Sequence, residues 1–463
     1  MMAKKAWQIE LETMQNSIPV ALELAEQGWN YAETLEMVED AAVSMKWHSN
    51  VPGSHAEEHV IIGAMQDMEN MGYDVSAAEA MIETGRKYLQ EGNKSALAGH
   101  TARVWNVMMN SPKIPDHPYW KHTIYESFEQ YAEKVTFPTY EYDMESEDFL
   151  RRTHLGWQGQ IVAGAIGTAV EGYVTENIRK VFGEIYDYPR TPNTFNDDIT
   201  YELALIKAIE KAGKNVTSAD IAEQWVALVP MGWSAEEIAL ANLKLGIFPP
   251  MSGYLNNPYR EWIGAQMRGV ICGQLFPGKP REAARLAWMD GQVSHHNNGI
   301  LGEVFNAVMA SLSYVETDIR KIVKMAIDMI PVDGEYYTVV KFAWDESQKH
   351  ADWESAWKVC EKKYERYNWI HAYPNAAAEV VAMYFGNGDF DETMHIIAMC
   401  GWDVDCNAAQ IATVIAAANK VELNEKWTAP IGDKLDTYMR DIKKLSIYEL
   451  SQHTCDLARM LNS

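Results

Sequence analysis

Apolar residues recur at three- and four-residue spacing through much of the chain, which is the pattern of amphipathic α-helices. This spacing predicts helices over residues 30–45, 76–90, 199–213, 217–229, 234–246 and 280–293. Ser218 and Ser234 each stand two residues before an acidic residue, as is common at helix N-termini. The best strand candidates, residues 134–142 and 335–344, are also compatible with loop or helix. We therefore predict an all-α fold without a regular internal repeat.

One change in composition divides the chain. Residues 111–120 are rich in proline, and residues 136–148 are acidic and aromatic with little helical periodicity. A helical region is expected to end between these two segments. We therefore predict a helical N-terminal region of unknown role over residues 1–135 and a larger second domain over residues 136–463.

Charge and composition argue against several classes of function. The chain has 463 residues, of which 47% are hydrophobic, and a net charge of −25. Such a charge repels nucleic acid, and no local basic stripe offsets it. The N-terminus lacks the apolar core of a secretory leader, and no run reaches the roughly 20 apolar residues of a membrane helix. Five scattered cysteines without CxxC pairs indicate reduced thiols, so we expect a cytoplasmic protein without nucleic-acid or membrane partners.

Two clusters of polar and acidic residues stand just before apolar helical segments. Their members are Asn196, Asp197 and Asp198 in the first cluster and Asp403, Asp405 and Cys406 in the second. A single aspartate can cap a helix and complement its dipole, but adjacent acids at two such junctions exceed what capping requires. If the clusters meet, a divalent cation with oxygen ligands neutralises their repulsion. The residues alone leave capping and a site for one or two Mg²⁺ or Mn²⁺ ions equally open.

Glycines interrupt an apolar helical segment over residues 159–178. Gly164 and Gly167 each weaken a helix by about 1 kcal/mol relative to alanine. Their presence within a helical segment therefore indicates close packing or the approach of a ligand. Glu171 follows these glycines. It is either an exposed residue at a helix end or a carboxylate turned into the space that the glycines open.

Two further segments are rich in polar and aromatic residues. Residues 294–298 read Ser-His-His-Asn-Asn before an apolar helix. No HExxH or Cys/His spacing accompanies them, which favours capping or hydrogen bonding to a ligand over zinc. Residues 246–269 are rich in Gly, Pro and Asn and contain Tyr254, Tyr259 and Trp262. They form either a plain surface connection or a loop that stacks on a sugar or base.

Four motifs occur together in a familiar order. AGAIGTAVEG begins at Ala163, NDDITYELAL at Asn196, SHHNNGILGEVF at Ser294 and GWDVDCNAAQIA at Gly401. In order and spacing they resemble the ADP-ribosylglycohydrolase family, in particular its bacterial members with a long N-terminal extension. The resemblance starts at about Asp148 and covers about two thirds of the chain. It implies an orthogonal multi-helix bundle with two divalent metals at its mouth, plus a helical N-terminal region that it does not cover.

The resemblance also implies roles for individual residues. The family's metal ligands fall on Asn196, Asp197, Asp198, Asp403, Asp405 and Cys406. Glu171 matches the glutamate that closes the family's first glycine-rich helix, and Glu171 and Asp198 are the candidate acid and base groups for the implied reaction. The implied substrate-binding residues are Ser252, Gly253, Tyr254, Asn256, His295 and Gly302.

Some positions depart from the family pattern. Ala163 and Gly164 stand where the family usually has Gly-Asp, Asn196 and Cys406 replace hydroxyl ligands, and Val404 replaces a threonine. An amide oxygen still suits Mg²⁺, whereas a thiol suits it poorly. One metal position is therefore expected to be weakened, remodelled or lost.

The resemblance therefore implies a glycohydrolase that depends on one or two Mg²⁺ or Mn²⁺ ions. The implied reaction is the hydrolysis of an N- or O-glycosidic bond of a ribosyl group, in an ADP-ribosyl or related small glycoside. The expected partner is a small-molecule or ADP-ribosylated substrate, and a homo-oligomer is left open. The alternative is a catalytically degenerate family member with a ligand-binding or structural role, which the altered ligand positions favour.

Overall fold

The fold is all-α, with long irregular connections between its helices, as the periodicity predicts. The computed structural model describes residues 4–463. The helices up to residue 135 are α1 (Ala6–Asn16), α2 (Tyr31–Trp47), α3 (Val60–Asn70), α4 (Ser76–Glu79), α5 (Ile82–Gln90), α6 (Lys94–Met109) and α7 (Phe128–Ala132). Those that follow are α8 (Glu147–Gly167), α9 (Thr175–Phe182), α10 (Asp197–Ala212), α11 (Ser218–Leu228), α12 (Ser234–Lys244), α13 (Met251–Tyr254), α14 (Val270–Leu275), α15 (Pro280–Gly291), α16 (Asn298–Leu312), α17 (Ile319–Asp328), α18 (Glu335–Lys349), α19 (Trp353–Tyr364), α20 (Ala372–Gly386), α21 (Phe390–Cys400), α22 (Val404–Asn419), α23 (Glu425–Thr428) and α24 (Ile447–Asn462).

Strands are confined to three antiparallel pairs of two residues each within residues 4–463. They are β1 (Ser49–Asn50) with β2 (Glu57–Glu58), β3 (Tyr173–Val174) with β4 (Gly401–Trp402), and β5 (Leu435–Asp436) with β6 (Lys444–Leu445). Two of these pairs hold loops beside the candidate site described below.

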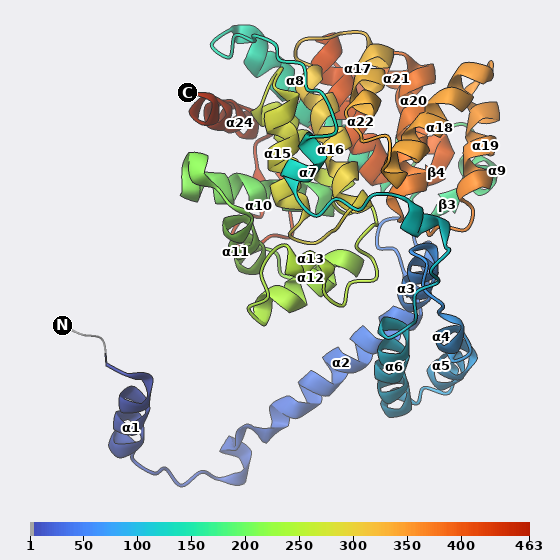
Figure 1. Cartoon of the computed structure of the whole chain (residues 1–463). Helices are drawn as coiled ribbons and strands as arrows, with labels where there is room; N and C mark the ends of the chain where they lie inside the picture. The colour runs from blue at the N-terminus through green and yellow to red at the C-terminus, as the bar shows by residue number, and fades with distance from the viewer. Residues whose placement is uncertain (1–3) are drawn as a thin grey trace.

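The N-terminal segment extends away from the helical body (Figure 1). Helix α1 buries none of its residues, and α2 buries only Trp47 at its C-terminal end. Large apolar side chains are exposed along the segment, among them Trp7, Ile9, Leu11, Met14, Ile18, Val20, Leu22 and Leu24. Its first two helices therefore add almost nothing to the hydrophobic core.

The rest of the N-terminal region packs against the larger domain. Tyr119 donates a hydrogen bond to Glu261 across 2.7 Å, and the buried carboxylate of Asp67 lies 3.1 Å from His371. Buried apolar residues from Trp47 onward belong to the same core as those of the C-terminal helices. The division of the chain at residue 135 stays a prediction.

Helices α8 and α22 pack against each other in the centre of the molecule, and small residues allow their close approach. A Cβ on Gly159 would lie 3.0 Å from the carbonyl oxygen of Ala412. One on Gly167 would lie 2.2 Å from the backbone of Asp405. The helices therefore run antiparallel, and the C-terminal end of α8 lies on the N-terminal end of α22. Close packing is the reason for Gly167.

The two strand candidates do not form strands. Residues 335–344 belong to α18, where Tyr336, Val339, Val340 and Ala343 are buried at helical spacing. Residues 134–142 form turn and irregular structure. The predicted helix over residues 76–90 is divided into α4 and α5. Among residues 4–463, no helix has the length and apolar character needed to cross a bilayer.

Candidate active site

The two polar clusters lie together where α10 and α22 begin. The thiol of Cys406 donates a hydrogen bond to Oδ1 of Asp198 across 3.3 Å, joining residues 208 positions apart. One ligand atom from each of Asp403, Asp405 and Cys406 lies within 4.8 Å of the others. These four side chains are all buried. The chain thus gathers distant acidic residues into one buried carboxylate cluster.

At the start of α10, Asn196 is the N-cap residue. Its Oδ1 accepts a hydrogen bond from the backbone N–H of Asp198 at 2.7 Å, so the capping interpretation holds for this residue. Its Nδ2 has no hydrogen-bond partner within residues 4–463. Asp197 is half-buried at the edge of the cluster. A Cβ on Gly164 would lie 3.0 Å from Asn196 Nδ2, so this glycine leaves room for the amide.

The pairing of β3 with β4 holds the residues just before α22 against those that follow α8. Gly401 has φ of +73°, and a Cβ there would lie 2.1 Å from the carbonyl oxygen of Tyr173, so a side chain is excluded. Trp402 adopts φ of +67°, which is uncommon for a residue with a side chain. The backbone N–H of Gly172 donates to the Trp402 carbonyl at 2.8 Å. These contacts hold Glu171 beside the second acidic cluster.

Asn375 on α20 orients the first turn of α22. Its Oδ1 accepts hydrogen bonds from the Asp403 backbone N–H at 3.2 Å and from Asn407 Nδ2 at 2.8 Å. The Oδ1 of Asn407 is buried without a partner within residues 4–463. Asn375 was not predicted as a site residue, because nothing near it in the sequence marks it.

Burial and mutual repulsion raise the pKa values of the carboxyl groups. Burial is the main cause for Glu171, whose pKa rises well above its usual range, and Asp405 and Asp403 raise it further. Burial and then Asp405 raise the pKa of Asp197 to about 6. The pKa of Asp198 also lies well above its usual range, because of burial and then Asp197. The cluster therefore favours bound protons or a cation.

The thiol of Cys406 is held in its protonated form. Burial raises its pKa well above the usual range, and the neighbouring Asp198 raises it further. A protonated thiol is a donor, which agrees with its hydrogen bond to Asp198.

The hairpin of β1 and β2 covers the Glu171 side of the cluster. A Cβ on Gly53, at the tip of the hairpin, would lie 2.4 Å from Glu171 Oε1 and 2.4 Å from the carbonyl oxygen of Thr168. Arg190 donates hydrogen bonds to the carbonyl oxygens of Gly53 and Thr168. Tyr173 donates to the carbonyl of Ser54 at 3.1 Å. Part of the N-terminal region thus lies over the acidic cluster.

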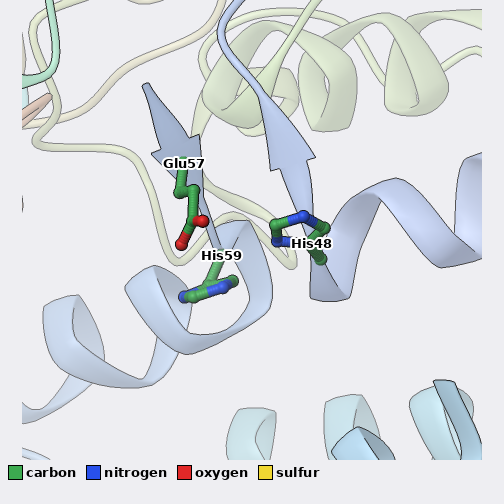
Figure 2. A group of neighbouring side chains, drawn as sticks. All are labelled: His48, Glu57 and His59. Carbon is green, nitrogen blue, oxygen red and sulfur yellow. The ribbon is translucent and has the colours of Figure 1, made fainter. Parts of the chain in front are cut away.

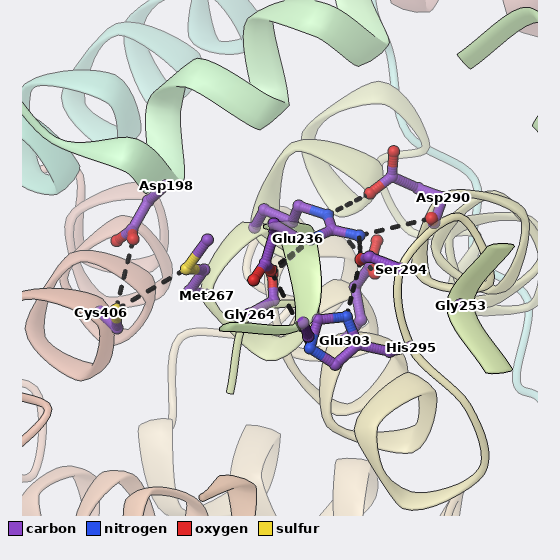
Figure 3. Close-up of polar contacts among 12 residues, drawn as sticks. Asp198, Glu236, Gly253, Gly264, Met267, Asp290, Ser294, His295, Glu303 and Cys406 are labelled. Atoms are coloured by element: carbon purple, nitrogen blue, oxygen red, sulfur yellow. Dashed lines mark hydrogen bonds and ion pairs between the residues drawn. The ribbon is translucent and has the colours of Figure 1, made fainter. Parts of the chain in front are cut away.

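A buried charge network adjoins the cluster (Figure 3). The Met267 thioether lies 3.8 Å from Cys406 Sγ, and the next residue, Arg268, is fully buried. The Arg268 guanidinium lies 2.5 Å from Asp290, 3.5 Å from Glu236 and 3.9 Å from Glu303. This network was not predicted, since its members are scattered along the sequence and carry no motif.

Among the predicted substrate-binding residues, His295 and Gly253 lie beside this network. His295 is fully buried, bonds to Ser294 Oγ through Nδ1 at 2.7 Å, and has Nε2 3.9 Å from Glu236. A Cβ on Gly253 would lie 2.6 Å from the His295 carbonyl oxygen. The exposed ring of Tyr254 packs edge-on against His296.

The other predicted substrate-binding residues have partners within the protein or face solvent. Ser252 donates its hydroxyl to the carbonyl of Val293 at 2.7 Å. Gly302 packs on Gln266, where a Cβ would lie 2.7 Å from Oε1. Asn256 is exposed with φ of +55°. Their contact with a substrate stays a prediction.

The residues present fit a divalent cation. Oδ2 of Asp198 and Oδ1 of Asp405 are buried without hydrogen-bond partners within residues 4–463. A buried oxygen of this kind is costly unless a proton, water or cation satisfies it. Carboxylate and amide oxygens are the ligands that Mg²⁺ and Mn²⁺ prefer.

The domain is all-α, and its buried acidic cluster contains two oxygens without partners within residues 4–463. The sequence profile of the ADP-ribosylglycohydrolase family matches residues 145–456. The chain therefore belongs to this family of glycohydrolases.

Two further comparisons identify similar chains. An uncharacterized protein from Archaeoglobus fulgidus is 22% identical over 289 residues, which are 60% of this chain and 90% of that protein. A solved structure described as an ADP-ribosylglycohydrolase-related protein complex is 16% identical with a TM-score of 0.48, and the match covers 68% of this chain and all of the other.

Proposed function

We propose that the protein hydrolyses a glycosidic bond of a ribosyl group, in an ADP-ribosyl or related small glycoside, and depends on Mg²⁺ or Mn²⁺. One observation carries the proposal: acidic residues from the starts of α10 and α22 form a single buried cluster that contains unpartnered oxygens. Family membership supports glycohydrolase chemistry. The residues that would hold the cation are Asn196, Asp197, Asp198, Asp403, Asp405 and Cys406.

The bound cation would neutralise the carboxylates and polarise the hydroxyl groups of a ribosyl group and a water molecule. Asp197, which is half-buried at the edge of the cluster, would orient the sugar. Water must lose a proton as it attacks the anomeric carbon, and the leaving group must gain one. Glu171 and Asp198 are the carboxyl groups proposed for these transfers, because both are buried beside the cluster and have raised pKa values.

Gly53 and Arg190 would exclude water on one side of the site. The hairpin tip touches Glu171, so a substrate approaching from that side must displace it. The half-buried edge at Asn196 and Asp197 is the other approach.

The alternative is a degenerate family member that binds a ligand without turnover. The hydrogen bond from Cys406 to Asp198 favours it, because a protonated thiol occupies a place where the family has a hydroxyl ligand. This alternative predicts ligand binding that does not depend on a divalent cation.

Turnover assays separate the two functions. ADP-ribosyl-arginine, ADP-ribosyl-serine and free nucleosides would each be incubated with Mg²⁺, Mn²⁺ or EDTA. The proposal expects turnover of at least one substrate that EDTA and Asp198→Asn abolish, whereas the exposed control Asp116→Asn leaves it intact. Turnover unaffected by EDTA, or no turnover of any substrate, would contradict it.

A further inference from the structure

A second group of metal-ligating side chains lies at the base of the β1–β2 hairpin. One ligand atom from each of His48, Glu57 and His59 lies within 4.8 Å of the others. Figure 2 shows the three side chains grouped where α2 ends and α3 begins. The group is separate from the carboxylate cluster: its histidines flank the hairpin, whereas Gly53 at the tip is the part that contacts Glu171.

The strand register explains why these three residues face one another. Ser49 pairs with Glu58 and Asn50 with Glu57, so extending the register places His48 opposite His59. Side chains alternate between the two faces of a strand, and Glu57 therefore shares the face of His59. Glu58 turns to the opposite face, where it is buried and accepts a hydrogen bond from Trp233 at 2.9 Å.

The side chains of the group are free to bind a ligand. No hydrogen bond or ion pair within residues 4–463 engages the His48 or His59 ring or the Glu57 carboxylate. His48 and Glu57 are exposed and His59 is half-buried.

We propose that His48, Glu57 and His59 form a binding site for a transition-metal cation of the Zn²⁺ type. Two imidazoles and one carboxylate are a protein ligand set that Zn²⁺ accepts, with water in the fourth position. Tetrahedral bonds of about 2.0–2.2 Å place ligand atoms roughly 3.3–3.6 Å apart, which small rotations of the three side chains would achieve. The cation would tie β1 to β2 and stiffen the hairpin that covers Glu171.

This site differs in chemistry from the carboxylate cluster. Nitrogen ligands favour Zn²⁺, Co²⁺ and Ni²⁺ over Mg²⁺, whereas the buried carboxylates favour hard cations. The Zn²⁺ site does not depend on hydrolytic activity. A negative result for one of the two proposed cation sites therefore leaves the other proposal standing.

Calorimetric titration of the full chain with Zn²⁺, in Mg²⁺ sufficient to saturate hard-cation sites, tests the proposal. The expected result is one Zn²⁺ bound per chain, with affinity at least about tenfold weaker in His48→Gln and in His59→Gln. His55→Gln is the matched control, because His55 is an exposed histidine of the same hairpin that lies outside the group. Circular dichroism would verify that each variant is folded.

Hydrogen exchange shows where in the chain Zn²⁺ binds. Zn²⁺ should slow amide hydrogen exchange at residues 49–58 in the wild-type chain and in His55→Gln but not in His48→Gln. Absence of Zn²⁺ uptake by the wild-type chain would overturn the proposal. Equal Zn²⁺ affinity in the wild type and both ligand variants would overturn it as well.

Discussion

The thiol of Cys406 donates a hydrogen bond to Oδ1 of Asp198 across 3.3 Å, and this contact joins the first turn of α22 to that of α10. It satisfies one carboxylate oxygen and leaves the other, Oδ2, without a partner within residues 4–463. A single sulfur atom thus connects the two halves of the candidate site. It also stands where a hydroxyl group would be a better ligand for a hard cation.

Cys406→Ser is predicted to tighten Mg²⁺ binding by roughly three- to tenfold, the effect of one additional polar interaction of about 1 kcal/mol. The serine hydroxyl keeps the donor to Asp198 and adds a hard oxygen ligand. Cys406→Ala, which removes the donor, should not tighten binding. Calorimetric titration with Mg²⁺ measures both variants, and equal affinities would rule out a ligand position at residue 406.

The raised carboxyl pKa values make the effect of a cation on stability depend on pH. Asp197 has a pKa of about 6 in the folded chain against 3.8 for the free group. Because its folded pKa is the higher one, its stabilising contribution is complete below pH 3.8 and is lost as pH rises through 6. A cation relieves the repulsion that remains above pH 6.

Mg²⁺ or Mn²⁺ should therefore raise the melting temperature more at pH 7.5 than at pH 5, where protons compete for the same oxygens. At 100 times its dissociation constant, a cation adds about 2.7 kcal/mol of stability. Thermal melts with and without Mn²⁺ at the two pH values measure this difference. An equal gain at both would argue against binding by these carboxylates.

Gly167→Ala is predicted to destabilise the protein by about 1–3 kcal/mol or more, because its Cβ would lie 2.2 Å from the backbone of Asp405. The clash would push α22 away from α8 and displace the second acidic cluster. Gly99→Ala is the control, since Gly99 is exposed on α6 with no atom within 4 Å of its added Cβ. Urea denaturation should show Gly99→Ala to be neutral or more stable. A neutral Gly167→Ala would refute the packing argument.

Gly53→Ala tests the cover over Glu171. The added methyl group would lie 2.4 Å from Glu171 Oε1, so the hairpin tip must lift or the carboxyl group must turn away. We expect faster hydrogen exchange at residues 51–56 and altered turnover, with global stability reduced by less than for Gly167→Ala. Unchanged exchange in this hairpin would show that the tip is not held by the contact.

Features that depend on neighbouring residues in the chain could be predicted from the sequence. The helical period placed α10, α11, α12 and α15 within about two residues of their observed ends. The secondary structure of residues 335–344 was ambiguous, because β-branched and aromatic residues are common in strands. These residues form a helix, in which the apolar side chains at helical spacing are buried. The acidic clusters were recognisable because each lies within a few residues of sequence.

Contacts between residues distant in the chain could not be predicted from the sequence. Arg268, Asp290 and Glu303 are far apart in the chain, and each alone has the appearance of an ordinary surface charge. Their burial follows from packing around α16, which no local pattern encodes. In the same way, the contact of Gly53 with Glu171 depends on how the hairpin docks on the larger domain.

Mn²⁺ titration of the intact chain and of the single variants Asp198→Asn and Asp405→Asn tests most directly whether the starts of α10 and α22 form one cation site. We predict uptake of one or two Mn²⁺ ions by the wild-type chain and loss of at least one ion in each variant, with Asp116→Asn unchanged. Absence of Mn²⁺ uptake by the wild type, or wild-type uptake in either site variant, would contradict a shared site.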